Sequence, residues 1–398
     1  MQAIKELYKI GYGPSSSHTI APARACQLFL DTYGRFPYYE IDLYGSLSLT
    51  GKGHRTDEII KETLEPSEVK VYFRLEWDED FENGFYLRGY DEDHELKQQW
   101  TVFSVGGGTF QVKGRELDIS REVYEEKTFA ELKEHCLSSY DLVRYVEKHE
   151  PDVREHLKKC LNAMIESVES GLRSEGVLRG EMYVARSARQ LIRTAEAIDN
   201  EVEAQKIRLL AYAYATSEEN ADGRRVVTAP TLGSCGVMAG LMYDQHVKGV
   251  DHEKLIDSLC VAGIFGNLIK QNATISGAVG GCQAEVGAAV AMAGAAMAYL
   301  MGLNINHIEY AAEMGIEHHL GLTCDPVKGY VIIPCIERNG MGLLRAVDAA
   351  TLSHYMVKKN RISFDAVVET MKYTGNHIVK ELKETSLGGL AAVYENKS

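Results

Sequence analysis

Apolar and polar positions follow two different patterns along this chain, and the change lies near residue 153. As far as about Gln111, short β-rich stretches alternate with two helical segments. The stretches typical of strands are EIDLYG, VKVYFRLEW, GFYLRGY and TVFSVGGGTF. The helical segments are TIAPARACQLFLDTYG, with Pro22 in its first turn and Gly34 at its end, and TDEIIKETL. We therefore expect an α+β domain over residues 1–116.

Long helical patterns dominate the rest of the chain. They are VREHLKKCLNAMIESVESGL, EVEAQKIRLLAYAYATSEE, HEKLIDSLCVAGIFGNLIKQ, an Ala-rich segment, GLLRAVDAATLSHYMVKK and FDAVVETMKYTGNHIVKELKE. The pattern predicts an all-α domain over residues 153–398, joined to the first domain by a charged connecting segment over 117–152. The uncharged run from Val286 to Ile305 is long enough to cross a bilayer, but its Ala, Gly and Met content favours a helix buried inside the protein.

The charge and the N-terminal sequence limit the partners and the compartment that we expect. The 398 residues carry 43 basic and 57 acidic side chains, a net charge of −14, which argues against nucleic acid as a partner. The N-terminal sequence MQAIKELYKIGYGP lacks the apolar core of a signal peptide, so we expect the protein in the cytoplasm. The eight Cys residues are then expected to be reduced thiols or metal ligands and not disulfides.

Three of the cysteines lie in loop-like surroundings within the helical half. They are Cys282 in GGCQAEVG, Cys324 in GLTCDPVKG and Cys335 in IPCIERN. Gly or Pro close to each one bends the backbone, so that the thiolates can be aimed at one point. Three converging thiolates without a fourth partner suit a [4Fe-4S] cluster with one iron open to substrate, and an open iron is a Lewis acid.

Zinc is the alternative for these thiols. Structural zinc sites usually contain close pairs such as CxxC, and no such pair occurs here. Catalytic zinc more often uses His, and EHH at Glu317–His319 lies near Cys324, but adjacent residues of a helix point in different directions. The spacing favours the cluster. For Cys235 a ligand and a small buried residue both remain open, while the cysteines on apolar helical patterns are expected to be inert: Cys26, Cys136, Cys160 and Cys260.

Two polar loops precede the helices of the first domain. In GYGPSSSHT, Ser15, Ser16, Ser17, His18 and Thr19 lie just before a helix, where free N–H groups and hydroxyls favour binding of an anion such as a carboxylate. A simple helix N-cap would need one hydroxyl and not three with a histidine.

The second loop, YGSLSLTGKGHRTD, places His54 just before a helix capped by Thr56. The positive end of a helix favours a neutral imidazole that accepts a proton, although an exposed loop histidine is the equal alternative. In NATISGAVGGCQ, Asn272 is a candidate to hydrogen-bond substrate, with helix capping equally plausible.

Together these motifs resemble the iron–sulfur-dependent L-serine dehydratases. GPSSSHT, YGSLSLTGKGH, SVGGG, ENADGRRVVTAPT, NATISGAVGGCQAEVG, MGIEHHLGLTCDPVKGYVIIPCIERN and TSLGGLA occur in the family's order and cover nearly the whole chain. The resemblance implies an N-terminal α+β domain similar to the allosteric substrate-binding domain of some phosphoglycerate dehydrogenases. It further implies an all-α C-terminal [4Fe-4S] domain and a single-chain enzyme that is often a homodimer.

The resemblance also implies roles for particular residues. Cys282, Cys324 and Cys335 would hold the cluster, and His18 and His54 would handle protons opposite the open iron. The residues expected to hold L-serine are Ser15, Ser16, Ser17 and Thr19, with Asn272 assisting. The expected reaction is elimination of water from L-serine, which gives pyruvate and ammonia.

Three alternatives remain beside this expectation. Threonine, cysteine or another small amino acid fits the same chemistry, since one methyl changes discrimination by only about 1–3 kcal/mol. A pyridoxal-phosphate enzyme is disfavoured, because SVGGGTF at Ser104–Phe110 resembles a phosphate loop but no lysine stands in a Schiff-base setting. A non-catalytic sensor of serine or of the cluster would not need both histidine loops and all three cysteines.

Overall fold

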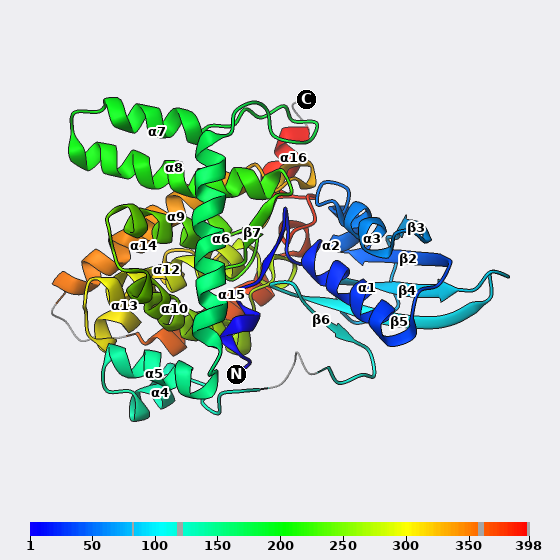
Figure 1. Ribbon diagram of the computed structural model, residues 1–398, viewed down its shortest axis with the longest axis horizontal. Helices are drawn as coiled ribbons and strands as arrows, with labels where there is room; N and C mark the ends of the chain where they lie inside the picture. Colours follow the sequence, from blue (N-terminus) through cyan, green and yellow to red (C-terminus); the bar gives the residue numbers. More distant parts are fainter. Residues whose placement is uncertain (82, 118–121, 357–361, 396–398) are drawn as a thin grey trace.

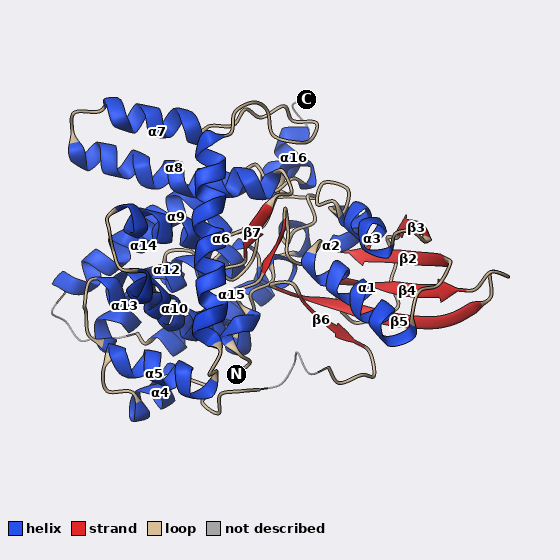
Figure 2. Ribbon diagram, in the orientation of Figure 1, coloured by secondary structure: helices blue, strands red, loops and turns tan. Residues whose placement is uncertain are grey.

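The computed structural model describes residues 1–81, 83–117, 122–356 and 362–395. The chain forms an N-terminal part built around a β-sheet and a larger part made of helices, which lie side by side (Figures 1 and 2). This arrangement confirms the α/β character predicted for the first part and the helical character of the second. The likeness of the first part to an allosteric substrate-binding domain stays a prediction, as do the domain boundaries.

The sheet of the first part has five strands in the order β3-β2-β4-β5-β6. The strands are β2 (Tyr38–Gly45), β3 (Glu68–Phe73), β4 (Asn83–Tyr90), β5 (Leu96–Gly106) and β6 (Thr109–Val112). Strands β2 and β3 are parallel, and the other neighbours are antiparallel. Helices α1 (Ile20–Tyr33) and α3 (Thr56–Leu64) pack together and share one apolar core with the sheet, while α2 (Ser46–Leu49) follows β2 directly.

Side-chain alternation explains this sheet. Phe85 and Leu87 on β4 are fully buried and pair with Val102 and Trp100 on β5, which are also buried, while the residues between them are more exposed. Because successive side chains of a strand point to opposite faces, this register gives the sheet one apolar face for the helices to cover. The strands and both helices expected from the sequence are confirmed, and α1 ends at Tyr33, just before Gly34, whose φ of 79° suits glycine.

The first twelve residues belong to the helical part in space. Strand β1 (Ile10–Tyr12) pairs antiparallel with β7 (Arg225–Val227), and Ile4, Leu7 and Tyr8 are buried in the helical core. The short 3-10 helix Ile4–Glu6 lies in the same segment. The loop that carries the three serines therefore starts from a strand that is fixed to the second part of the molecule.

The second part consists of helices around one central helix. They are α4 (Phe129–His135), α5 (Ser139–His149), α6 (Val153–Arg173), α7 (Ala188–Ala197), α8 (Glu201–Ala221), α9 (Cys235–Val247), α10 (His252–Asn272), α11 (Gly277–Gly280), α12 (Ala288–Leu300), α13 (Ile305–Glu317), α14 (Cys335–Tyr355), α15 (Phe364–His377) and α16 (Gly389–Glu395). The Ala-rich α12 packs among α9, α10, α13 and α14, and most of its residues are buried. None of the described helices is both long and apolar enough to cross a membrane.

One helix ends earlier than its apolar pattern predicted. We expected the segment after Phe364 to remain helical as far as residue 384, but α15 ends at His377, and only the 3-10 turn Lys380–Leu382 follows. The chain then forms a parallel bridge between Lys383 and Cys324. This departure brings a C-terminal segment to the junction between the two parts of the molecule.

Candidate active site

Two of the predicted thiols converge with an acidic side chain inside the helical part. Cys282 lies between α11 and the π-helical turn Gln283–Gly287, and Cys324 lies in the loop after α13. The sulfur atoms of Cys282 and Cys324 and a carboxylate oxygen of Glu285 all lie within 4.8 Å of one another. Cys335, the first residue of α14, lies outside this tight group but interacts electrostatically with Cys282. We call Cys282, Cys324, Cys335 and Glu285 the thiol half of the site.

The thiol half is acidic, with one cationic side chain against it. A shared hydrogen bond with Cys324 lowers the pKa of Cys282, as does the guanidinium of Arg338, and the same shared bond and burial raise the pKa of Cys324. Burial, with the charge of Cys282, also raises the pKa of Cys335. Burial raises the pKa of Glu285 too. Because burial and mutual charge hold Cys324, Cys335 and Glu285 toward their neutral forms while Cys282 is favoured as a thiolate, these donors suit a positively charged metal centre.

Glycine lets the backbone approach these groups closely. A Cβ on Gly277 would lie 2.5 Å from Oε2 of Glu285 and 3.3 Å from the sulfur of Cys324. Gly281, just before Cys282, has a φ of 74°, which L side chains rarely adopt. The SGAVGGC stretch therefore needs its glycines to bring Cys282 and Cys324 together.

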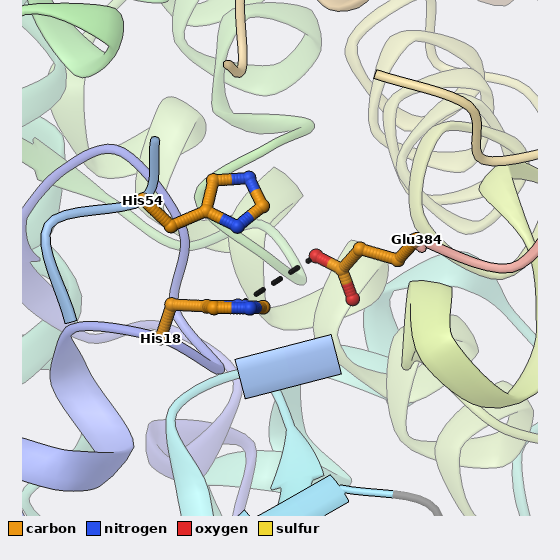
Figure 3. Close-up of side chains that lie close together, drawn as sticks. All are labelled: His18, His54 and Glu384. Carbon is orange, nitrogen blue, oxygen red and sulfur yellow. Dashed lines mark ion pairs between the residues drawn. The ribbon is translucent and has the colours of Figure 1, made fainter. Parts of the chain in front are cut away.

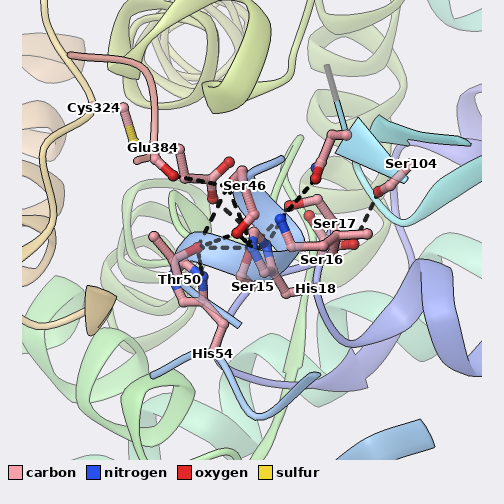
Figure 4. A network of polar contacts seen from close by, with 12 residues as sticks. Ser15, Ser16, Ser17, His18, Ser46, Thr50, His54, Ser104, Cys324 and Glu384 are labelled. Carbon is pink, nitrogen blue, oxygen red and sulfur yellow. Dashed lines mark hydrogen bonds and ion pairs between the residues drawn. The ribbon is translucent and has the colours of Figure 1, made fainter. Parts of the chain in front are cut away.

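The other half of the site is a network around two histidines. The Nδ1 atom of His18 lies 3.1 Å from the Ser15 hydroxyl and 2.9 Å from the Ser17 hydroxyl, and its Nε2 lies 2.9 Å from Thr50 Oγ1. His54 places its Nδ1 2.9 Å from the same threonine oxygen. The two imidazole rings lie 4.1 Å apart between centroids. We call His18, His54, Thr50, Ser15 and Ser17 the histidine half of the site (Figure 4).

Both imidazoles are neutral near pH 7. Burial lowers the pKa of His18 to about 4, and burial together with the neighbouring His18 holds the pKa of His54 well below its usual value. The sequence predicted a neutral His54 from the positive end of α3, whereas burial is the larger cause. His18 is fully buried and His54 is 1% exposed, so His54 is not the exposed loop histidine that the sequence left open.

Glu384 joins the two halves and was not among the residues predicted from sequence. Its Oε1 lies 3.8 Å from His18 Nδ1, and donor atoms of His18, His54 and Glu384 lie within 4.8 Å of one another (Figure 3). Its backbone N–H donates to the carbonyl of Cys324 at 2.7 Å, and its carbonyl accepts from the Ser46 hydroxyl at 2.8 Å. The adjacent TSLGGLA motif, starting at Thr385, was the signal that could have pointed to it.

The serine loop is held in place from both parts of the molecule. The Asn220 side chain donates to the Pro14 carbonyl at 2.7 Å, and the Ser104 hydroxyl donates to the Ser17 carbonyl at 2.9 Å. The Thr19 hydroxyl faces the backbone carbonyls of Tyr12 and Ser15, each at 2.8 Å. Ser16 faces the backbone N–H of Leu232 at 3.5 Å. Within the loop, Ser15 and Ser17 thus contact His18, whereas Ser16 and Thr19 contact the backbone.

Other residues considered from the sequence lie elsewhere. Asn272 ends α10, and its amide donates to the Lys127 carbonyl at 2.7 Å. Cys235 is 1% exposed and packs with apolar side chains, so it is a small buried residue. His318 and His319 each bond a carbonyl of their own helix, and within the described chain neither joins the tight group of Cys282 and Cys324.

The fold and the site together define a class: a two-part chain whose junction places buried thiols suited to a metal centre beside two neutral imidazoles. The chain belongs to the serine dehydratase family. The family profile described as serine dehydratase alpha chain matches residues 114–391, and the one described as serine dehydratase beta chain matches residues 3–73, so both components occur in one chain.

Curated relatives match along nearly the full length of the chain. It is similar to the L-serine dehydratase TdcG of Escherichia coli K12, with 36% identity over 446 residues that cover 97% of this chain and 98% of the relative. The L-serine dehydratase of Streptomyces coelicolor is 36% identical, covering 98% of each chain. That of Haemophilus influenzae is 34% identical, covering 98% of this chain and 99% of the relative.

Proposed function

We propose that this protein is an L-serine dehydratase, a lyase that converts L-serine to pyruvate and ammonia. The observation that carries the proposal is the meeting of buried thiols and neutral imidazoles at one junction, linked through Glu384. Full-length similarity to enzymes that bear this name supports the same reaction.

We propose that the resident cofactor is a [4Fe-4S] cluster held by Cys282, Cys324 and Cys335. The donors fit such a group, because thiolates are the ligands that iron–sulfur clusters take, and their mutual repulsion is relieved by bound metal. When bound, a cluster with three protein ligands supplies an iron that can act as a Lewis acid toward the substrate hydroxyl.

The hydrogen bonds of the histidine half assign the protons on both rings. His18 Nε2 lies 3.1 Å from the carbonyl oxygen of Ser46, which can only accept, so Nε2 carries the proton and Nδ1 accepts from the serine hydroxyls. The Thr50 hydroxyl donates to the same carbonyl at 2.9 Å, so it accepts from His54 Nδ1. This pattern leaves a free lone pair on His54 Nε2.

We assign His54 as the base that removes the α-proton of serine. A neutral imidazole with a free lone pair accepts a proton readily, and a well-placed base contributes roughly 10²–10⁴-fold to the rate. His18 has partners at both nitrogens, so its role is to position the serine hydroxyls and Thr50, which in turn orients His54.

Ser15, Ser16, Ser17 and Thr19 remain the proposed substrate-holding loop, at the start of α1, where backbone N–H groups favour a carboxylate. Ser15 and Ser17 have the better support, since both line the buried surface beside His18. Asn272 bonds Lys127 and is left out of this site. A cytoplasmic location and a homodimer remain further proposals. Sedimentation of the purified protein tests the homodimer.

Product analysis of anaerobically reconstituted protein tests the proposed function. L-serine should give pyruvate and ammonia in equal amounts, and L-threonine and L-cysteine, assayed alongside, should turn over more slowly. A fully loaded protein that binds L-serine without forming pyruvate would favour the serine sensor instead.

A further inference from the structure

Glu384 carries a buried carboxylate that lacks a cationic partner among the described residues. The residue is 4% exposed, and its Oε2 atom has no hydrogen-bond partner there. Among the described residues, His18 is the one basic side chain paired with Glu384, with its Nδ1 3.8 Å from Oε1 of the carboxylate. That Nδ1 already accepts from the hydroxyls of Ser15 and Ser17. The Ser46 hydroxyl and the Ala278 backbone reach the carboxyl group, but burial and the charges of Glu285 and Cys282 raise its pKa well above the usual value. A buried carboxylate normally needs a cation or several donors, so the unpartnered Oε2 is available to a cationic ligand that would offset this burial.

The backbone of Glu384 is fixed to both halves of the site. Its N–H donates to Cys324 in the thiol half, and its carbonyl accepts from Ser46, whose own carbonyl contacts His18. Its φ of 57° lies in the left-handed region, which non-glycine residues seldom adopt. These constraints point the carboxylate toward His18 and His54 (Figure 3), while the backbone of Glu384 contacts Ser46 and Cys324 (Figure 4).

A small pocket is lined by both chain neighbours of Glu384, Lys383 and Thr385, although not by Glu384 itself. It has a volume of about 60 Å³, and its lining includes Ser46, Ala278, Thr385 and the cationic Arg74, Lys380 and Lys383. Ser46 bonds the backbone of Glu384, and the backbone of Ala278 bonds its carboxylate. A ligand that combines a carboxylate with a cation matches these surroundings, because the pocket lining is basic and the neighbouring Glu384 is acidic.

We propose that Glu384 binds the α-ammonium group of the amino-acid substrate and thereby selects amino acids over hydroxy acids of the same shape. The inference rests on the proposed function, whose substrate carries that group. An ammonium has three N–H donors, and a free carboxylate oxygen accepts them in charge-assisted hydrogen bonds. Glu384 is thus a substrate-binding residue, distinct from the groups that transfer the proton.

The test compares two ligands that differ only in the ammonium group. KM and kcat for L-serine, and the inhibition constant of 3-hydroxypropanoate, are measured on anaerobically reconstituted wild-type protein and on Glu384→Gln. Calorimetric binding of 3-hydroxypropanoate provides a readout besides turnover. Glu381→Gln, an exposed glutamate of the same segment, is the matched control.

The expected result is a rise of roughly ten- to hundredfold in KM for L-serine with Glu384→Gln, the worth of one hydrogen bond to a charged group. Affinity for 3-hydroxypropanoate should stay within about twofold, and Glu381→Gln should match wild type for both ligands. An unchanged KM would overturn the inference. So would a parallel loss for both ligands, which a cation bound by His18, His54 and Glu384 would produce.

Two further arms keep the result decisive. If Glu384→Gln fails to retain iron and sulfide, Glu384→Asp replaces it. A smaller rise in KM for L-serine with unchanged 3-hydroxypropanoate affinity then supports the inference. A parallel loss of affinity for both ligands overturns it. If the wild-type protein forms no pyruvate, the proposed function fails. Calorimetry with L-serine on wild type and the variant then tests ammonium binding by itself, and equal affinities overturn it.

Discussion

The histidine half and the thiol half of the site are both buried, but the protein satisfies their polar groups to different degrees. Both nitrogens of His18 and the Nδ1 of His54 have hydroxyl or carbonyl partners within 3.1 Å. In the thiol half, Cys282, Cys324 and Glu285 face one another at 4.8 Å or less, with the cationic Arg338 beside them. The histidine half is therefore organised by the protein's own hydrogen bonds, whereas the groups of the thiol half could hold a metal.

This difference separates what each half contributes. A network that is already complete can orient a base before substrate arrives, without reorganisation during the reaction. Thiols buried together with a carboxyl group gain most of their stabilisation when a cation binds. Loss of metal should consequently abolish the reaction while leaving the histidine half folded.

The largest expected effect comes from the thiol half. Cys324→Ala should remove bound iron and sulfide and abolish pyruvate formation, because two remaining thiols cannot hold the cluster. Iron and sulfide analysis with the pyruvate assay measures this. Cys235→Ala is the matched control, a buried cysteine outside the site that should keep both. A Cys324→Ala protein with a full complement of iron and normal turnover would break the comparison.

The next effect comes from the base. His54→Gln should lower kcat by roughly 10²–10⁴-fold while leaving iron and sulfide content unchanged, since His54 bonds only the histidine half. Steady-state kinetics on reconstituted protein gives the answer. Near-normal turnover with an intact cluster would remove His54 from the mechanism.

The pH dependence sharpens the assignment further. A base works when it is neutral, and burial lowers the pKa of His54 well below 6.5, so the neutral form persists as pH falls through 6.5. We expect kcat/KM to stay level from pH 7.5 to 6.5 and to decline only at lower pH. Iron content measured at each pH separates titration from cluster loss. An acid limb centred at or above 6.5 would contradict a buried neutral base.

The smallest effect concerns the anchor of the serine loop. Asn220→Ala removes the donor to the Pro14 carbonyl and leaves a buried acceptor unpaired, which should cost about 1–3 kcal/mol in the free energy of unfolding and lower kcat modestly. Denaturant unfolding and kinetics measure the two consequences. Asn272→Ala loses a similar bond to Lys127, which belongs to neither half of the site, and its kcat should be unchanged. Equal kcat in both variants would show that the loop needs no anchor.

Elements with a strong periodic pattern were predictable from the sequence. The spacing of apolar residues and the stop at Gly34 predicted α1, and the pattern TDEIIKETL matches α3. Helices α7, α9 and α13 were not anticipated. Helix α9 is buried along most of its length and shows little amphipathic contrast, which makes such a helix hard to recognise.

The site was predictable where chemistry lies in short motifs, and less so where distant segments meet. His18, His54 and the cysteines stand in distinctive loops, so local residues point to them. Glu384 looked like part of a continuing helix, because its apolar spacing suited one, and only the pairing of Lys383 with Cys324 brings it to His18. Glu285 is likewise an ordinary helix residue until the turn after Cys282 directs it at the sulfurs.

The most direct test of the central claim is a titration of activity against cluster content. Anaerobic reconstitution in steps should give a pyruvate-forming rate that rises in proportion to bound iron and reaches its maximum near four iron and four sulfide per chain. Cys282→Ala, Cys324→Ala and Cys335→Ala should each fail to reach that content. Full activity in protein stripped of iron, or no activity at full loading, would contradict the account.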